Sequence, residues 1–196
     1  MDAMTLLLSR ASVGPKHLVE PGPDESQLRQ MLEAALHAPD HGELVPYRFK
    51  VVSGESRRAM SRLFGEAARR AGKDAAGVAL DEERALLPPV TVAVVARLDL
   101  GHPQVPAHEQ WVAVGGALTN FLNAAHALGF GGKMLSGAKV RDPGLVAAFC
   151  EPGETLVGWI ALGTPARAGK PRPARSGAAL ALTAWQPPEA DSPAAR

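Results

Sequence analysis

The sequence predicts an α+β domain in which helices surround a small mixed sheet. Three segments, residues 47–52, 90–96 and 155–162, have the composition and periodicity of strands. Between them, apolar residues recur every three or four positions, which is typical of helices with one buried face. At 196 residues the chain has the length of one domain with a single core.

Composition narrows the class of protein. Hydrophobic residues make up 46% of the chain and charged residues 21%, as in ordinary globular proteins. The net charge of +1 gives no general attraction to nucleic acids or membranes. The single cysteine, Cys150, cannot form an internal disulfide, and Asp2 stands where a signal peptide would carry a basic residue. We therefore expect a cytoplasmic protein.

Two helices are expected in the first forty residues. The first spans about residues 1–10. The second begins after Asp24, a favourable N-cap that can exchange hydrogen bonds with Gln27, and ends before Pro39. Its expected buried face consists of Leu28, Met31, Leu32, Ala35 and Leu36.

The middle of the chain alternates strands and helices. Residues 47–52 alternate apolar and basic side chains, as a half-buried strand does. A helix is expected from Ser56 to a closing Gly72, and a polar helical stretch around residues 81–84. Residues 90–96 are rich in β-branched side chains and should form a fully buried strand.

The longest predicted helix covers about residues 107–128. Gly115 and Gly116 in its interior cost about 1 kcal/mol each relative to alanine, so we expect close packing against another backbone there. Its apolar face is expected to comprise Trp111, Val114, Leu118, Phe121, Leu122, Ala125 and Leu128.

The last third of the chain should contain one short helix and one strand. Asp142 is a cap and Pro143 a first helical residue, which predicts a helix up to Cys150 before the strand at residues 155–162. In the proline-rich remainder only residues 178–185 are apolar enough to pack. Its basic run is expected to be a solvated tail, with a phosphate contact as the alternative: Arg167, Lys170, Arg172 and Arg175.

The segment Arg10-Ala11-Ser12 lies where the first helix gives way to a loop. An arginine offers forked donors suited to phosphate, and a serine hydroxyl with nearby backbone N–H groups can complete the cradle. A surface arginine beside a capping serine explains the same residues, so the sequence leaves both interpretations open.

His37 and His41 lie four residues apart at the end of the second helix. Pro39 separates them and no third ligand is evident, so we expect no metal site. A neutral imidazole can donate one hydrogen bond and stack, which makes His41 a candidate neighbour of a flat ligand. A loop histidine bonded to backbone is the alternative.

A glycine-rich segment, Gly129-Phe130-Gly131-Gly132, follows the long helix. Its first glycine is expected to end the helix, and the later pair lets the backbone approach a ligand or turn sharply. It is not the dinucleotide-binding fingerprint, because it follows a helix rather than a strand. No nucleophile elbow is present, and Cys150 is expected to pack rather than react.

Four motifs occur in a telling order: residues 1–12, Ala38-Pro39-Asp40-His41 with Pro46-Tyr47-Arg48-Phe49, residues 111–137, and Leu162-Gly163-Thr164-Pro165. Together they resemble the nitroreductase superfamily, in particular its short bacterial members of the YdjA type. The resemblance covers about residues 1–166 and leaves residues 167–196 as a C-terminal extension. It implies a nitroreductase-like fold with a mainly antiparallel sheet.

The resemblance also implies a homodimer with FMN at the subunit interface and the extension packed on the partner. Hydride would pass from NAD(P)H through flavin N5 to a nitroaromatic, quinone or similar acceptor, in ping-pong fashion, with no catalytic side chain. Lys16 is the candidate for a charge beside flavin N1 and C2=O. The residues implied to bind FMN are Arg10, Ala11 and Ser12, then His37 and His41 from the same or the partner subunit, and Met134, Leu135 and Ser136 from the other subunit. Those implied to bind NAD(P)H are Ala127, Leu128, Gly129, Phe130, Gly131 and Gly132.

The chain departs from the family pattern at several implied FMN contacts. Ala11 replaces an arginine, and Met134-Leu135 replaces a tryptophan and an arginine. Each lost ion pair or hydrogen bond removes about 1–3 kcal/mol of binding free energy. One alternative function is therefore a flavin-binding or sequestering protein without efficient turnover. A third is flavin-dependent dehydrogenation of a small metabolite.

Overall fold

The computed structural model describes residues 2–167 and 182–185. Most of the predicted C-terminal extension, including Lys170, Arg172 and Arg175, lies outside the described residues. Within residues 182–185, Leu182 and Trp185 are more than 80% exposed, so this part of the segment expected to pack touches no core of its own protomer. No helix in residues 2–167 is long and apolar enough to cross a membrane.

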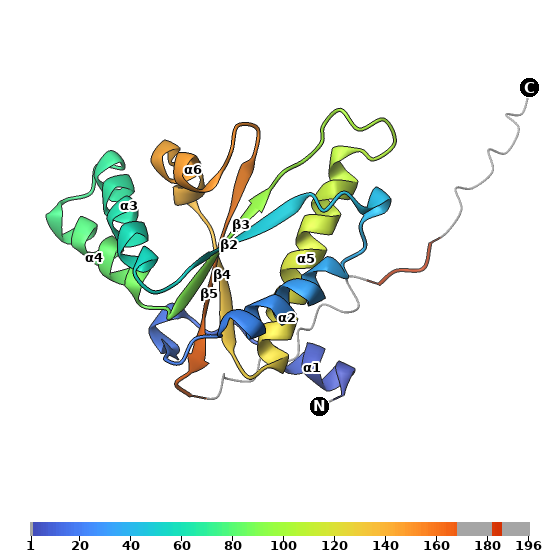
Figure 1. The fold of residues 1–196 in the computed structure, drawn as a ribbon, viewed down its shortest axis with the longest axis horizontal. Coiled ribbons are helices and arrows are strands. Elements are labelled where there is room, and N and C mark those ends of the chain that lie inside the picture. Colours follow the sequence, from blue (N-terminus) through green and yellow to red (C-terminus); the bar gives the residue numbers. More distant parts are fainter. Residues whose placement is uncertain (1, 168–181, 186–196) are drawn as a thin grey trace, which may run out of the picture.

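A five-stranded sheet forms the centre of the molecule (Figure 1). Strand β5 (Thr155–Pro165) pairs with β3 (Val90–Ala96) and with β4 (Gly131–Leu135), and β2 (Tyr47–Val52) pairs with β3. The two-residue β1 (Leu18–Val19) pairs with the end of β5. These ladders are all antiparallel, and within residues 2–167 parallel pairing is limited to an isolated bridge between Ser12 and Gly132. The predicted α+β class and mainly antiparallel sheet are confirmed.

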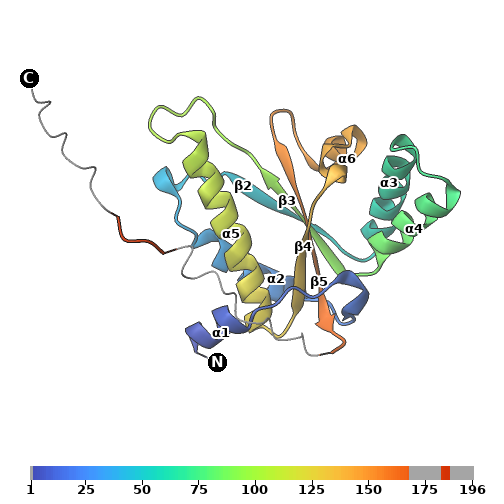
Figure 2. The ribbon, with the colours of Figure 1, turned by 180° about the vertical axis from the view of Figure 1, so that it is seen from behind.

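Helices cover both faces of the sheet (Figures 1 and 2). One layer contains α2 (Glu25–Leu36) and α5 (Ala107–Ala127), with the short α1 (Ala3–Ser9) against α5. The other contains α3 (Ser56–Arg70), α4 (Ala75–Leu86) and α6 (Pro143–Phe149). In β3, Val92 and Val94 belong to the α2/α5 core, whereas Ala93 and Val95 belong to the α3/α6 core. Because both faces are covered, all of β3 is buried, as predicted.

The helix signals in the sequence act as expected at several ends. Asp24 and Gln27 form the predicted capping box at the start of α2. Gly129, at φ +87°, follows the last turn of α5. Gly116 packs against Ala38, since a Cβ added there would lie 3.1 Å from the Ala38 Cβ. Gly115, by contrast, has nothing within 4 Å of such an atom.

The predicted apolar faces of α2 and α5 contain more residues than the core of the protomer buries. Met31 and Ala35 are buried as predicted, but Leu32 and Leu36 are exposed. On α5, Trp111 is 40% exposed, and the residues that are buried instead include Gln110, Ala113 and Ala117. Leu118, Leu122 and Leu128 are only partly buried.

The sequence missed β1 and β4, and it placed two boundaries wrongly. The helix predicted around residues 81–84 begins at Ala75, and the last strand continues to Pro165. Gly131 and Gly132, predicted to be a loop, form the start of β4. Added Cβ atoms there would lie 2.8 Å from Leu18 Cδ2 and 3.0 Å from Leu122 Cδ2, so these glycines serve side-chain packing.

Asp142 ties α3 to α6. Its carboxylate accepts hydrogen bonds from Arg70 Nε and Nη2 at 2.9 and 2.8 Å, and it caps α6 by accepting from the Leu145 N–H. The Arg70 guanidinium lowers the pKa of Asp142 to about 2. Its folded-state pKa thus lies below the ordinary value of 3.8, so the ion pair stabilises the fold above about pH 4 and loses that effect as the pH falls toward 2.

We therefore predict that Asp142→Asn removes about 1–2 kcal/mol of unfolding free energy at pH 7 but much less at pH 2.5. Asparagine keeps the cap and removes the charge. The measurement is urea denaturation at both pH values. Asp74→Asn is the control, because Asp74 caps α4 without a cationic partner in the described chain. Equal losses at the two pH values would contradict this role for the ion pair.

Candidate functional site

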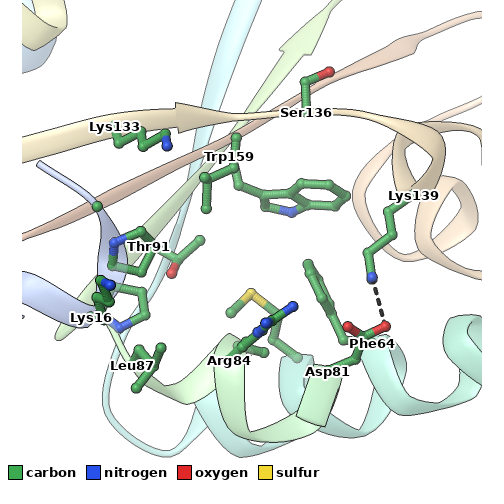
Figure 3. Close-up of a pocket in the computed structure, with 16 residues that line it drawn as sticks. Lys16, Phe64, Asp81, Arg84, Leu87, Thr91, Lys133, Ser136, Lys139 and Trp159 are labelled. Carbon is green, nitrogen blue, oxygen red and sulfur yellow. Dashed lines mark hydrogen bonds and ion pairs between the residues drawn. The ribbon is translucent and has the colours of Figure 1, made fainter. Parts of the chain in front are cut away.

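A cavity of about 530 Å³ lies between the sheet and the α3–α4 pair (Figure 3). Such a volume falls within the range of small-molecule sites. The turn at residues 14–16 and the segment after β4 close its sides. Its lining residues are Gly14, Pro15, Lys16, Met60, Phe64, Asp81, Arg84, Ala85, Leu87, Pro88, Thr91, Lys133, Leu135, Ser136, Lys139 and Trp159.

The floor of the cavity is one face of the sheet. Trp159 of β5 is paired with Leu135 of β4 and with Ala93 of β3, and Thr91 lies two residues along β3 on the same face. Phe64 of α3 contacts the indole of Trp159 edge-on, with ring centroids 5.0 Å apart. The floor is therefore aromatic and held from below by the α3/α6 core.

One wall is built on the buried carboxylate of Asp81 in α4. Its Oδ2 accepts from Lys73 Nζ and Lys139 Nζ, each at 2.8 Å, and the side chain is 6% exposed. Burial raises the pKa of Asp81, but the hydrogen bonds from Lys139 and Lys73 outweigh it, so the pKa lies below its ordinary value. Asp81 thus stays ionised and joins α4 to the turn at residues 138–141.

The remaining charges around the cavity are positive. Lys16, Arg84 and Lys133 have no acidic partner within ion-pair distance among the residues the structure describes. Asp81 is the one acid among the lining residues, and it is shared between two lysines. The cavity is thus suited to a ligand that carries negative charge.

Two polar atoms in the floor have no hydrogen-bond partner in the described structure: Thr91 Oγ1 and Trp159 Nε1. Both residues are at least 96% buried, at 4% and 3% exposure. Figure 3 shows the indole and the hydroxyl turned toward the space between the strands and α4. An unsatisfied buried donor costs about 1–3 kcal/mol, so atoms of this kind mark a place where a ligand acceptor is missing.

Some of the residues predicted from the sequence lie at this cavity. Leu135 and Ser136 line it, and so does Lys16. The segment Arg10-Ala11-Ser12 runs beside β4, where Ser12 bridges Gly132. None of residues 10–12 lines the cavity itself.

His37 and His41 lie elsewhere in the protomer. His37 caps the C-terminus of α2, and His41 Nδ1 is 2.7 Å from Glu109 Oε2 at the start of α5. Both belong to the layer on the other face of the sheet, so they do not join the cavity within one protomer (Figure 2). In the described part of the chain, no three His, Cys, Asp or Glu side chains are grouped to hold a metal ion.

The other residues implied to bind nucleotide have structural roles. Met134 packs against the α2/α5 core, on the face away from the cavity. None of residues 127–132 lines the cavity, and Gly131 and Gly132 are buried against side chains. Cys150 packs beside the α3/α6 core, as predicted, and burial raises the pKa of its thiol.

Sequence reasoning missed most of the cavity. The sequence indicates Asp81 and Arg84 only as part of a polar helix, and Lys133 lies in a strand that the sequence does not predict. Phe64, Thr91, Lys139 and Trp159 carried no local signal, because each is an ordinary helix, turn or strand residue whose neighbours in space are distant in sequence.

Comparisons with known proteins agree on one family. The sequence pattern of the Nitroreductase family matches residues 7–164. Over 166 residues the chain is 37% identical to YdjA of Escherichia coli (strain K12), covering 84% of this chain and 89% of YdjA. A Haemophilus influenzae protein is 35% identical over 165 residues, with the same coverage. Both relatives are named as putative NAD(P)H nitroreductases.

Solved structures share the fold. A nitroreductase-like family protein from Bacillus cereus superposes with a TM-score of 0.80 at 21% identity, covering 95% of this chain and 97% of that one. A structure from Desulfovibrio desulfuricans, described as a nitroreductase in complex with FMN, has a TM-score of 0.71 at 22% identity, covering 96% and 99%. The family match over most of the chain and the identity to its curated relatives lead to one conclusion: this chain belongs to the nitroreductase family.

Proposed function

We propose that this protein is an FMN-dependent NAD(P)H oxidoreductase of the nitroreductase type, acting in the cytoplasm. The names of its relatives and the FMN complex of a structural neighbour support the proposal. The observation that carries it is the cavity on the α3/α4 face, which combines an aromatic floor, unpaired cations and unpaired donors.

These features fit the parts of FMN. A flat ring with carbonyl acceptors suits a floor that contains Trp159 and has donors without partners. The anionic phosphate suits the lysine and arginine side chains at the exposed rim. Lys16, which lines the cavity, is our candidate for the charge beside flavin N1 and C2=O. We assign Arg10 and Ser12, on the segment leading to Lys16, to the phosphate side.

When bound, FMN supplies the chemistry, by taking up a hydride from NAD(P)H and passing electrons to a nitroaromatic, quinone or similar acceptor. The chain's own residues bind and orient it. Lys16 and Arg84 hold positive charge at the cavity and so favour an anionic reduced ring. The Asp81 ion pairs keep α4, and with it Arg84, in place.

The cavity supplies positive charge for FMN, which bears on the sequestering alternative. The argument for a sequestering protein without efficient turnover is the loss of family cations at Ala11 and Leu135. Lys133 stands two residues before Leu135 on the same face of β4, and Lys16 and Arg84 also lack acidic partners in the described chain. We infer that these three side chains offset the lost positive charge.

We also propose a homodimer formed through an apolar face of α1, α2 and α5. Its exposed side chains are Met4, Leu7, Leu8, Leu32, Leu36, Trp111 and Val112. Gly115, open on the same long helix, is explained if a second backbone approaches it. His37 and His41 lie in this layer, across the sheet from the cavity, so the contact with FMN that the resemblance implies for them stays a prediction. Packing of residues 167–196 on the partner stays a prediction.

The first test is the absorption spectrum of purified protein titrated with FMN and then with NADPH or NADH without oxygen. We expect saturable binding and bleaching of the visible flavin band. Lys133→Gln should weaken FMN binding about 5–30-fold, the effect of one charged contact, while Lys50→Gln, a cation outside the cavity, should not. Absence of FMN binding to the wild type would overturn the proposed function, and binding without bleaching would favour sequestration.

For the dimer, Val112→Glu should yield monomers, because it places a charge in an apolar interface. The measurement is size-exclusion chromatography with light scattering. Leu80→Glu is the control, since Leu80 is exposed on α4 in the opposite layer. A Val112→Glu protein that remains dimeric would exclude this face as the interface.

A further inference from the structure

We propose that Trp159 Nε1 and Thr91 Oγ1 are the donors that recognise the carbonyl-bearing edge of the flavin ring in this protein. The inference rests on the proposed function. It assigns to two residues of the sheet a direct part in cofactor affinity.

The two donors belong to one surface. Thr91 is paired with Ala161 and Trp159 with Ala93, so the two side chains are diagonal neighbours on the same face of the β3–β5 ladder. The residues opposite each of them are alanines, which leaves room above the strands. Both donors line the cavity.

The protein itself supplies no acceptor for them. The carboxylate of Asp81 is the one acidic group among the lining residues, and its Oδ2 is taken by Lys73 and Lys139. An indole N–H can only donate, and the Thr91 hydroxyl does not accept from it, since neither atom has a hydrogen-bond partner in the described structure. We infer that the partner is an acceptor on a ligand.

The surroundings indicate what kind of acceptor this is. Met60, Phe64 and Ala85 contribute apolar surface, and the cations without an acidic partner, Lys16, Arg84 and Lys133, are exposed. Neutral donors in an apolar floor match neutral carbonyl oxygens on a flat ring, whereas a phosphate group matches the rim. The floor donors are therefore suited to a ring carbonyl, and the rim cations to the phosphate or, for Lys16, to the side of the ring that carries N1 and C2=O.

The test uses Trp159→Phe, which keeps an aromatic ring and removes the N–H, and Trp185→Phe as the matched control at an 81% exposed site. We expect Trp159→Phe to raise the dissociation constants of FMN and of riboflavin by the same factor, about tenfold for one lost hydrogen bond. Riboflavin carries the ring without the phosphate, so equal factors identify a contact with the ring. The melting temperature of the apoprotein is measured alongside, because Trp159→Phe removes an unsatisfied donor but also core volume beside Phe64 and Phe149.

Thr91→Val and Thr91→Ser provide a second pair. The isosteric valine should weaken both flavins and the serine should restore binding. These variants decide the question independently if Trp159→Phe disturbs the core.

Three outcomes would overturn the inference while leaving the proposed function intact. One is wild-type affinity for both flavins in Trp159→Phe and Thr91→Val. Another is a loss of FMN affinity with unchanged riboflavin affinity, which would assign the donors to the phosphate. The third is unchanged flavin affinity with a raised KM for menadione alone, which would assign them to the acceptor. Failure of the wild type to bind either flavin would instead remove the proposed function.

Discussion

The central position of β5 is the constraint on which the rest of the structure depends. This strand is hydrogen-bonded to β3 along one edge and to β4 along the other, and helices cover both of its faces. Consecutive residues therefore enter different environments: Ile160 joins the α2/α5 core, while Trp159 joins the α3/α6 core and the cavity floor. Gly158 allows β4 to approach, since an added Cβ would lie 2.2 Å from the Leu135 carbonyl oxygen. The fold thus places Trp159 of β5, Lys133 of β4 and Thr91 of β3 on the same surface of the sheet.

Electrostatics then decides what that surface can accept. A buried carboxylate shared by two lysines is neutralised by partners inside the protein, and removing one partner would leave an uncompensated charge. Because Asp81 is used in this way, it does not cancel the cations at the rim. The positive charge of the cavity is consequently available to a ligand, although two cations of the family pattern are absent at Ala11 and Leu135. In this chain, the absence of two cationic motif residues does not mean that the cavity lacks positive charge.

The parts of the fold that were predictable are those fixed by local rules. The period of β2, the β-branched run of β3 and the capping box of α2 each depend on residues close in sequence, and the structure confirms them. Strand β4 was missed because glycines open it, and their reason is packing against Leu18 and Leu122 from other elements. The cavity was missed for the same cause, since its residues come from segments between Gly14 and Trp159. Family motifs drew attention to Leu135 and Ser136, which line the cavity, whereas only the sheet register brings Thr91 and Trp159 together.

The apolar surface that the protomer leaves exposed is the surface that the proposed dimer would bury. The 3.6-residue pattern of α2 contains more leucines than the protomer buries, and the α5 pattern likewise leaves Trp111 exposed. A sequence pattern records every surface that is buried in the working protein, including surfaces covered only by another chain. His37 and His41 occupy the same layer, across the sheet from the cavity. Neither histidine therefore contacts a ligand in that cavity within one protomer, and the proposed second copy accounts for the exposed apolar face alone.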